Sequence, residues 1–229
     1  MRVHCWIFSI FVAGAFIFGG DARAQSWPKC PKIKGGAKIS LDFDPGRIVY
    51  DDTISRRQLA RMSKLTPNSD RHKNNATMGM TNVHYTTEFK GQAQGATRGP
   101  NRACARLKSV SMRVVIRELK IFILGDYAPG SCQYDTILAH EHQHAEIART
   151  TLRDNLVKIR RRLRFEVDRL GEVRDISVKR AFDTAFNRLR VRMKPVLDDM
   201  GRDLKRANAA LDSPESYAQF NARCRSWRK

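Results

Sequence analysis

Acidic residues are scarce in this 229-residue chain. Asp and Glu together number 23 against 43 Lys and Arg, which gives a formal net charge of +20 at pH 7. A charge of this size favours partners that carry negative charge, such as an anionic envelope polymer or membrane surface. The sequence contains no zinc-finger or ribonucleoprotein motif, so it does not favour nucleic acid as a specific partner.

Apolar runs long enough to span a bilayer are also lacking. The run at residues 6–20 follows Arg2, precedes Ala22-Arg23-Ala24 and is short for the roughly 20 residues of a membrane span. This order is typical of a secretory signal peptide, although an uncleaved anchor is the alternative. We therefore predict a signal peptide at residues 1–24 and a periplasmic or secreted bacterial protein, without a transmembrane helix in its mature form.

Cysteines are few, and none lies in a C-x-x-C pattern. Removal of Cys5 with the signal peptide would leave four, and an even number in an exported chain predicts two disulfides. The missing C-x-x-C spacing argues against a four-cysteine zinc site. Three pairings exist, and we predict Cys104–Cys132, which brackets an apolar stretch, and Cys30–Cys224, which joins the two ends.

The remaining chain, residues 25–229, has two halves with different patterns. Residues 25–133 are rich in Gly, Pro, Asn, Thr and β-branched residues, which is typical of strands and turns. Over residues 134–212 apolar side chains recur every three or four positions, which predicts amphipathic helices. We expect one α+β domain: a small antiparallel β-sheet, a long antiparallel helical hairpin that turns at residues 171–177, and a C-terminal tail at 213–229.

Local patterns predict the individual elements. Asp44-Pro45-Gly46 is expected to form a turn, and Pro195 to kink or split the second helix. The other expected elements are a short helix at residues 52–64, a loop at 65–75, a strand at 81–89, a glycine-rich loop at 91–102, and strands at 107–116 and 118–124.

Residues 140–144 read His-Glu-His-Gln-His and contain the pattern H-E-x-x-H. Residues four apart lie on one face of a helix, so His140 and His144 can bind one Zn²⁺ together. Glu141 lies beside the first ligand, where it can reach a water molecule rather than the metal. His142 points away from this face and receives no role. The alternative is a polar helix surface that binds no metal and matches the motif by chance.

A catalytic zinc site needs a third protein ligand, and no His follows His144. A second helix that returns antiparallel would bring residues 198–208 opposite the motif. Asp199 and Asp203 are therefore the first candidates for the third ligand, with equal weight. The alternative is a helix surface on which these acids balance neighbouring basic residues.

Other third ligands stay open. If the first helix ended soon after Arg153, Glu166 or Asp168 would become a candidate. His84 and His72, which lie in the β-rich half, come next.

Residues 132–149 read Cys-x-Tyr-x-x-Ile-Leu-Ala-His-Glu-x-x-His-x-x-Ile-Ala-Arg. This segment resembles the zincin metallopeptidases, and more closely a bacterial family of unknown function described as secreted zinc-dependent proteases. The resemblance covers residues 81–149 and implies zinc held by His140 and His144, with Glu141 as general base. Gln143 departs from the family pattern, in which many members carry Gly, and the resemblance supplies no third ligand.

The resulting hypothesis is an exported zinc-dependent metallopeptidase that hydrolyses peptide or envelope amide bonds. Zn²⁺ would activate a water molecule and Glu141 would accept its proton. Tyr85, Tyr127 and Tyr134 are candidates to stabilise the oxyanion. The alternative is a non-enzymatic, basic envelope protein with a structural or vestigial metal site.

Overall fold

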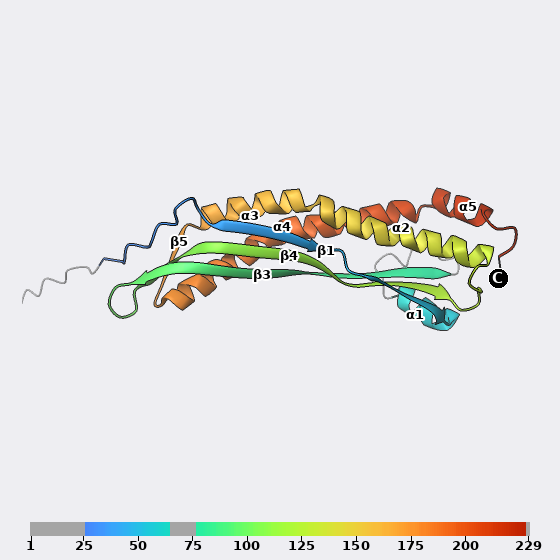
Figure 1. Ribbon diagram of the computed structural model, residues 1–229, viewed down its shortest axis with the longest axis horizontal. Coiled ribbons are helices and arrows are strands. Elements are labelled where there is room, and N and C mark those ends of the chain that lie inside the picture. Colours follow the sequence, from blue (N-terminus) through green and yellow to red (C-terminus); the bar gives the residue numbers. More distant parts are fainter. Residues whose placement is uncertain (1–25, 65–76, 228–229) are drawn as a thin grey trace, which may run out of the picture.

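The computed structural model of the protein describes residues 26–64 and 77–227 (Figure 1). The predicted signal peptide, residues 1–24, and the predicted loop at 65–75 lie outside the described residues. The elements are, in chain order, β1 (Lys38–Asp44), β2 (Ile48–Ile54), α1 (Arg56–Lys64), β3 (Gly79–Thr97), β4 (Ala103–Leu124), α2 (Cys132–Asp154), α3 (Leu156–Leu170), β5 (Glu172–Asp175), α4 (Val178–Leu211) and α5 (Pro214–Ala222). The predicted α+β class is confirmed.

Strand β4 organises the whole sheet. Strand β3 pairs antiparallel with it along almost its entire length, from Gly79 opposite Ile123 to Thr97 opposite Ala103. The other edge of β4 is shared by three shorter strands: β5 at residues 103–106, β1 at 109–115 and β2 at 119–124. Because β1 and β2 run parallel to β4, the sheet is a mixed five-stranded one, and the prediction of a purely antiparallel sheet is wrong.

The link between β1 and β2 explains the parallel strands. Asp44-Pro45-Gly46 was expected to form a turn, but the chain passes through it without reversing and continues along the same edge of β4. A side chain at Gly46 would lie 2.7 Å from the carbonyl oxygen of Ile116, so the link packs tightly on β4. Arg149 of α2 donates hydrogen bonds to the carbonyl oxygens of Pro45 and Gly46.

Strand β3 continues through two glycines where a loop was predicted, with a register shift between Gln92 and Ala93. Strand β3 runs on through residues 91–97, and β4 is one strand across the two runs that were predicted separately. A Cβ at Gly91 would lie 2.6 Å from Phe186, and one at Gly95 would lie 2.5 Å from Val178. These glycines therefore allow α4 to approach the sheet closely.

The helices form the predicted hairpin. The first arm consists of α2 and α3, which are separated at Asn155, and α4 returns along both (Figure 1). Pro195 lies inside α4 without splitting it. The turn at residues 171–177 contains β5, which pairs with the start of β4.

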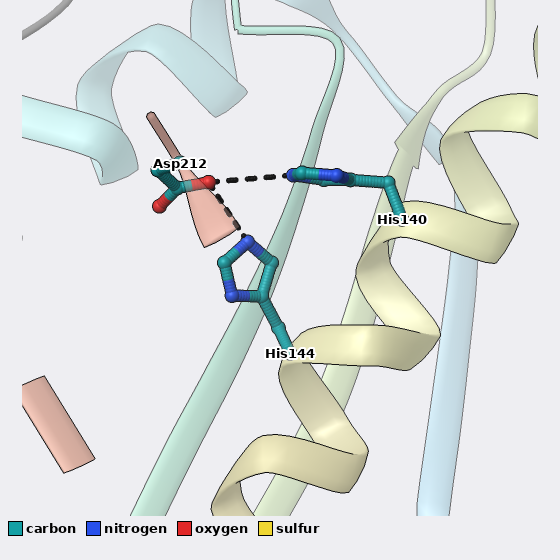
Figure 2. Close-up of side chains that lie close together, drawn as sticks. All are labelled: His140, His144 and Asp212. Carbon is teal, nitrogen blue, oxygen red and sulfur yellow. Dashed lines mark hydrogen bonds and ion pairs between the residues drawn. The ribbon is translucent and has the colours of Figure 1, made fainter. Parts of the chain in front are cut away.

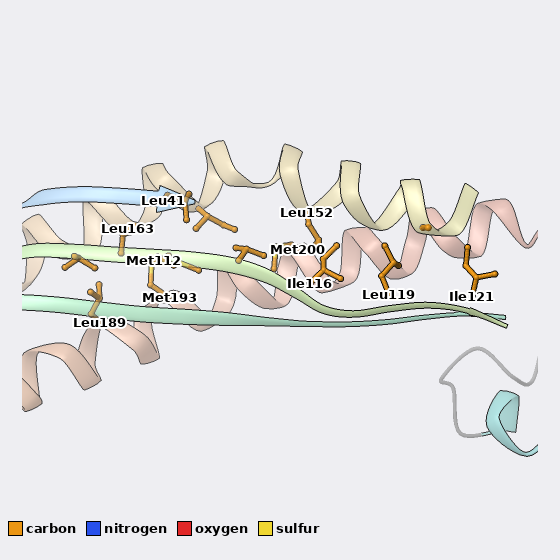
Figure 3. Close-up of a cluster of buried hydrophobic side chains, with 14 of the residues drawn as sticks. Leu41, Met112, Ile116, Leu119, Ile121, Leu152, Leu163, Leu189, Met193 and Met200 are labelled. Carbon is orange, nitrogen blue, oxygen red and sulfur yellow. The ribbon is translucent and has the colours of Figure 1, made fainter. Parts of the chain in front are cut away.

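The core lies between the helices and one face of β4 (Figure 3). Burial of each large apolar side chain contributes roughly 1.5–3 kcal/mol, so this contact fixes the helices on the sheet. The labelled buried residues are Leu41, Met112, Ile116, Leu119, Ile121, Leu152, Leu163, Leu189, Met193 and Met200.

All four cysteines of the described chain form disulfides, but the pairing differs from the prediction. Cys30 bonds to Cys104 at the start of β4, and Cys132 bonds to Cys224 after α5. Cys132 is the first residue of α2, and the returning α4 brings the C-terminal segment back to that point. Among the helices of residues 26–64 and 77–227, none is long and apolar enough to cross a membrane.

Candidate metal centre

Helix α2 places the motif between the sheet and the C-terminal helices. Its N-cap is Ser131, whose side chain accepts a hydrogen bond from the backbone N–H of Tyr134. The side chains of His140 and His144 are only 9% and 12% exposed. Both imidazoles project from α2 towards Asp212, the residue that ends α4 (Figure 2).

The two imidazoles and Asp212 form a compact donor set. Nε2 of His144 lies 3.0 Å from Oδ1 of Asp212, and Nε2 of His140 lies 3.3 Å from the same oxygen. In a tetrahedral zinc site with bonds of about 2.0–2.2 Å, neighbouring ligand atoms are about 3.3 Å apart. The spacing of His140, His144 and Asp212 therefore fits a group that can hold a metal ion.

Asn208 orients one of the imidazoles. Its Oδ1 lies 2.8 Å from Nδ1 of His144, while its amide nitrogen donates to the carbonyl oxygen of Leu204. An acceptor at Nδ1 keeps the proton of a neutral imidazole on that nitrogen, which leaves Nε2 as the ligand atom. Asn208 and Asp212 are four apart, so the end of α4 mirrors the spacing of the histidines on α2.

Substitution of Asn208 tests this orienting role. We expect Asn208→Ala to weaken zinc binding by about 10- to 100-fold, the range found when a partner of a metal-bound histidine is removed. Asn208→Asp keeps an acceptor and should stay close to the wild type. Competition against a fluorescent zinc chelator measures both, and equal affinity of the Ala variant and the wild type would contradict the role.

The charges of the site favour a bound cation. Burial disfavours a protonated His144, yet its hydrogen bond to Asp212 and the nearby Glu141 outweigh that cost and raise the pKa of His144 to about 9. Burial would raise the pKa of Asp212, but hydrogen bonds from His140 and His144 hold it well below its usual range. In the metal-free protein a proton therefore supplies the positive charge that a metal ion would bring.

Glu141 lies next to His140, His144 and Asp212 but is not one of the side chains that could hold the metal. It is buried, and its Oε2 accepts a hydrogen bond of 2.8 Å from Thr81 of β3. Gly79 makes room for it, because a Cβ there would lie 2.8 Å from Oε1 of Glu141 and 2.5 Å from Ile137. Burial raises the pKa of Glu141, while His144, His140 and the bond from Thr81 oppose that rise.

Helix α5 covers the site from the other side. The Tyr217 hydroxyl lies 3.4 Å from Oδ1 of Asp212, and the Phe220 ring centre lies 5.4 Å from that of His140. Burial, together with the charge of Asp212, raises the pKa of Tyr217 well above its usual value. The hydroxyl therefore stays protonated and can donate a hydrogen bond.

Tyr217 was missed in the sequence. Two of the tyrosines considered there have other partners: Tyr134 donates to Asp52, and Tyr127 to Met78. The sequence does contain a helix-start pattern, Ser-Pro, directly after Asp212. Ser followed by Pro is typical of the N-terminus of a helix. That signal predicts a new helix close to the end of α4.

The structure does not bring Asp199 or Asp203 to the histidines. Asp199 forms an ion pair with Arg202, and Asp203 pairs with Lys158 and Arg206. Asp203 precedes Asp212 by nine residues, or about 13 Å of helix.

The turn of the hairpin explains why Asp212, rather than Asp199 or Asp203, reaches the histidines. Its four-residue strand β5 is extended and covers about 13 Å, where four helical residues would cover about 6 Å. Helix α4 therefore starts further along, and Asn208 and Asp212 at its end, rather than Asp199 and Asp203, lie opposite the motif.

The remaining candidates lie elsewhere. His84 is exposed on β3, next to Val83, whose side chain packs towards the core; successive strand residues point to opposite faces. Glu166 is fully buried and forms ion pairs with Arg162 and Arg192. His72 lies outside the described residues. His142 contacts the hydroxyl of Tyr50 at 3.3 Å.

Comparison with protein-family models, curated proteins and solved structures found no match to this chain. The resemblance to the secreted zinc-dependent proteases therefore rests on the motif segment alone. Function has to be argued from the geometry around His140, His144 and Asp212.

Proposed function

We propose that this protein is an exported zinc-dependent metallopeptidase. The observation that carries the proposal is the convergence of His140, His144 and Asp212, with Glu141 beside them. Three protein ligands are typical of catalytic zinc, whereas structural zinc usually has four. Within the described residues, the group that can hold a metal consists of these three.

The residues divide the chemistry between them. Zinc, when bound, would supply Lewis acidity that activates a water molecule and polarises a substrate carbonyl. Glu141 accepts the proton of the attacking water and delivers it to the leaving amine, and Thr81 holds its carboxylate in place. Tyr217, with its protonated hydroxyl, stabilises the oxygen on which negative charge develops.

The proposed substrate is a peptide, a protein or an envelope amide. Two disulfides are consistent with an oxidising compartment outside the cytoplasm, so we place the reaction in the periplasm or the medium. The net charge of +20 favours substrates that are acidic or attached to an anionic surface.

A second function, a structural metal site in a non-enzymatic envelope protein, has one observation in its favour. His140 is nearly buried under Phe220 and Tyr217 of α5, and a closed site is typical of structural zinc. Hydrolysis by the purified protein separates the two functions.

Metal removal is the direct test. We expect the purified protein to carry about one zinc ion per chain, to cleave casein or a peptide library, and to lose that activity with a chelator. Zinc should restore activity and magnesium should not, because imidazole ligands suit zinc. A protein that retains no zinc when it is purified without chelators would contradict the proposal.

A further inference from the structure

A cationic hollow lies between α3 and β1, on a part of the molecule that the metal centre does not use. It has a volume of about 360 Å³ and is lined by Arg160, Arg161 and Arg164, with Ile39 and Val157 as apolar walls. Three arginine side chains thus line one opening on the surface.

Two of the arginines of the hollow donate hydrogen bonds to backbone carbonyl oxygens rather than to carboxylates. Arg164 donates to the carbonyl oxygen of Ala37 at 2.7 Å, and Arg160 to that of Leu41 at 3.5 Å. Within residues 26–64 and 77–227, Arg160, Arg161 and Arg164 form no ion pair with a carboxylate. Gathering like charges costs free energy that a bound anion would recover, and the planar guanidinium matches the oxygens of a phosphate.

Exposed apolar side chains on the same face of α3 favour a lipid as the source of the anion. Val157 is 65% exposed and Phe165 is 53% exposed, and with Arg161 and Arg164 they follow the spacing of one face of α3. Exposed apolar side chains next to basic ones can enter the headgroup region of an anionic bilayer, where burial and charge attraction both favour binding. A free phosphate ion would make no use of Val157 and Phe165.

We propose that this face of α3 docks the protein on a membrane surface, with the phosphate of an anionic phospholipid in the hollow. Arg160 lies 16 residues after His144, roughly 24 Å along the arm formed by α2 and α3, and Figure 1 shows α5 at one end of the molecule with α2 between it and α3. Docking through α3 therefore does not involve the residues of the metal centre.

The test is sedimentation of the disulfide-bonded protein with vesicles of phosphatidylcholine, with or without phosphatidylglycerol. We expect binding only to the anionic vesicles, and the triple variant R160Q/R161Q/R164Q should bind about 100-fold more weakly, since each basic residue at such a surface contributes about a factor of five. The matched control R47Q/R57Q/R61Q removes equal charge from exposed positions outside the helical hairpin and should bind within about threefold of the wild type.

Two further measurements decide between occupants. Val157→Ser with Phe165→Ser leaves the charge unchanged and should weaken vesicle binding at least about fivefold, given the apolar area removed from the bilayer. The proposal is overturned if the control variant loses as much binding as the hollow variant, or if the serine variant binds normally while inorganic phosphate or a nucleic-acid oligomer displaces the vesicles. Zinc content should be equal in all of these proteins, which keeps the outcome separate from the proposed peptidase function.

Discussion

Asp212→Ala is expected to lower zinc affinity by roughly 100- to 1,000-fold. The free energy of zinc binding in small protein sites is about 10–16 kcal/mol. If each of four ligands contributes equally, the loss of one lowers the affinity by roughly 100- to 1,000-fold. The loss should be this large because Asp212 is the residue on α4 that contacts both His140 and His144. Competition with a zinc chelator gives the affinity, and metal analysis of the purified variant gives the content.

The controls for this prediction are on the same helix. Asp199→Ala and Asp203→Ala remove carboxylates that pair with neighbouring basic side chains, so both should keep the zinc affinity of the wild type. Thermal unfolding of each metal-free protein shows whether the loss of Asp212, which ends α4, has disturbed the fold. If the Asp203 variant lost zinc and the Asp212 variant kept it, the assignment of the third ligand would be wrong.

Glu141→Gln is expected to reduce kcat by about 100- to 10,000-fold, the usual contribution of a general base, with little change in zinc content. Glutamine has the shape of glutamate and can still accept the hydrogen bond from Thr81, but it cannot take up a proton at neutral pH. Hydrolysis of a fluorogenic peptide, measured with zinc analysis of the same sample, separates the two effects.

Glu146→Gln is the matched control for this second prediction. Glu146 lies on the same helix, is exposed and accepts a hydrogen bond from Thr150, so its substitution should leave kcat unchanged. Hydrolysis that persists in the Glu141 variant at full zinc content would remove Glu141 from the mechanism. Absence of hydrolysis in the zinc-loaded wild type would instead favour the structural metal site.

The half of the metal centre that lies on one helix could be predicted from the sequence. His140 and His144 share a face because they are four residues apart, and this depends on helical geometry alone. Asp212 could not be predicted, because its place depends on the register between two helices, which the extended strand β5 shifts. A register set by a distant strand pairing leaves no local pattern near residue 212.

The sheet shows the same limit. Apolar runs identified the strands from residue 107 to 124, but such runs do not state a partner or a direction. Asp44-Pro45-Gly46 has the composition of a reversing turn, and only the pairing of both flanking strands with β4 shows that it does not reverse. Gly91 and Gly95 suggested a loop for a similar reason, since close packing of Phe186 on a strand has no sequence signature of its own.

The Cys132–Cys224 disulfide has a consequence for when the metal centre can assemble. His144 and Asp212 are 68 residues apart in the chain, and the crosslink joins points just before the first and just after the second. Closing such a loop raises the effective concentration of Asp212 at the two imidazoles before any metal arrives. Metal capture should therefore follow oxidation, and the reduced chain is expected to hold zinc more weakly than the disulfide-bonded protein.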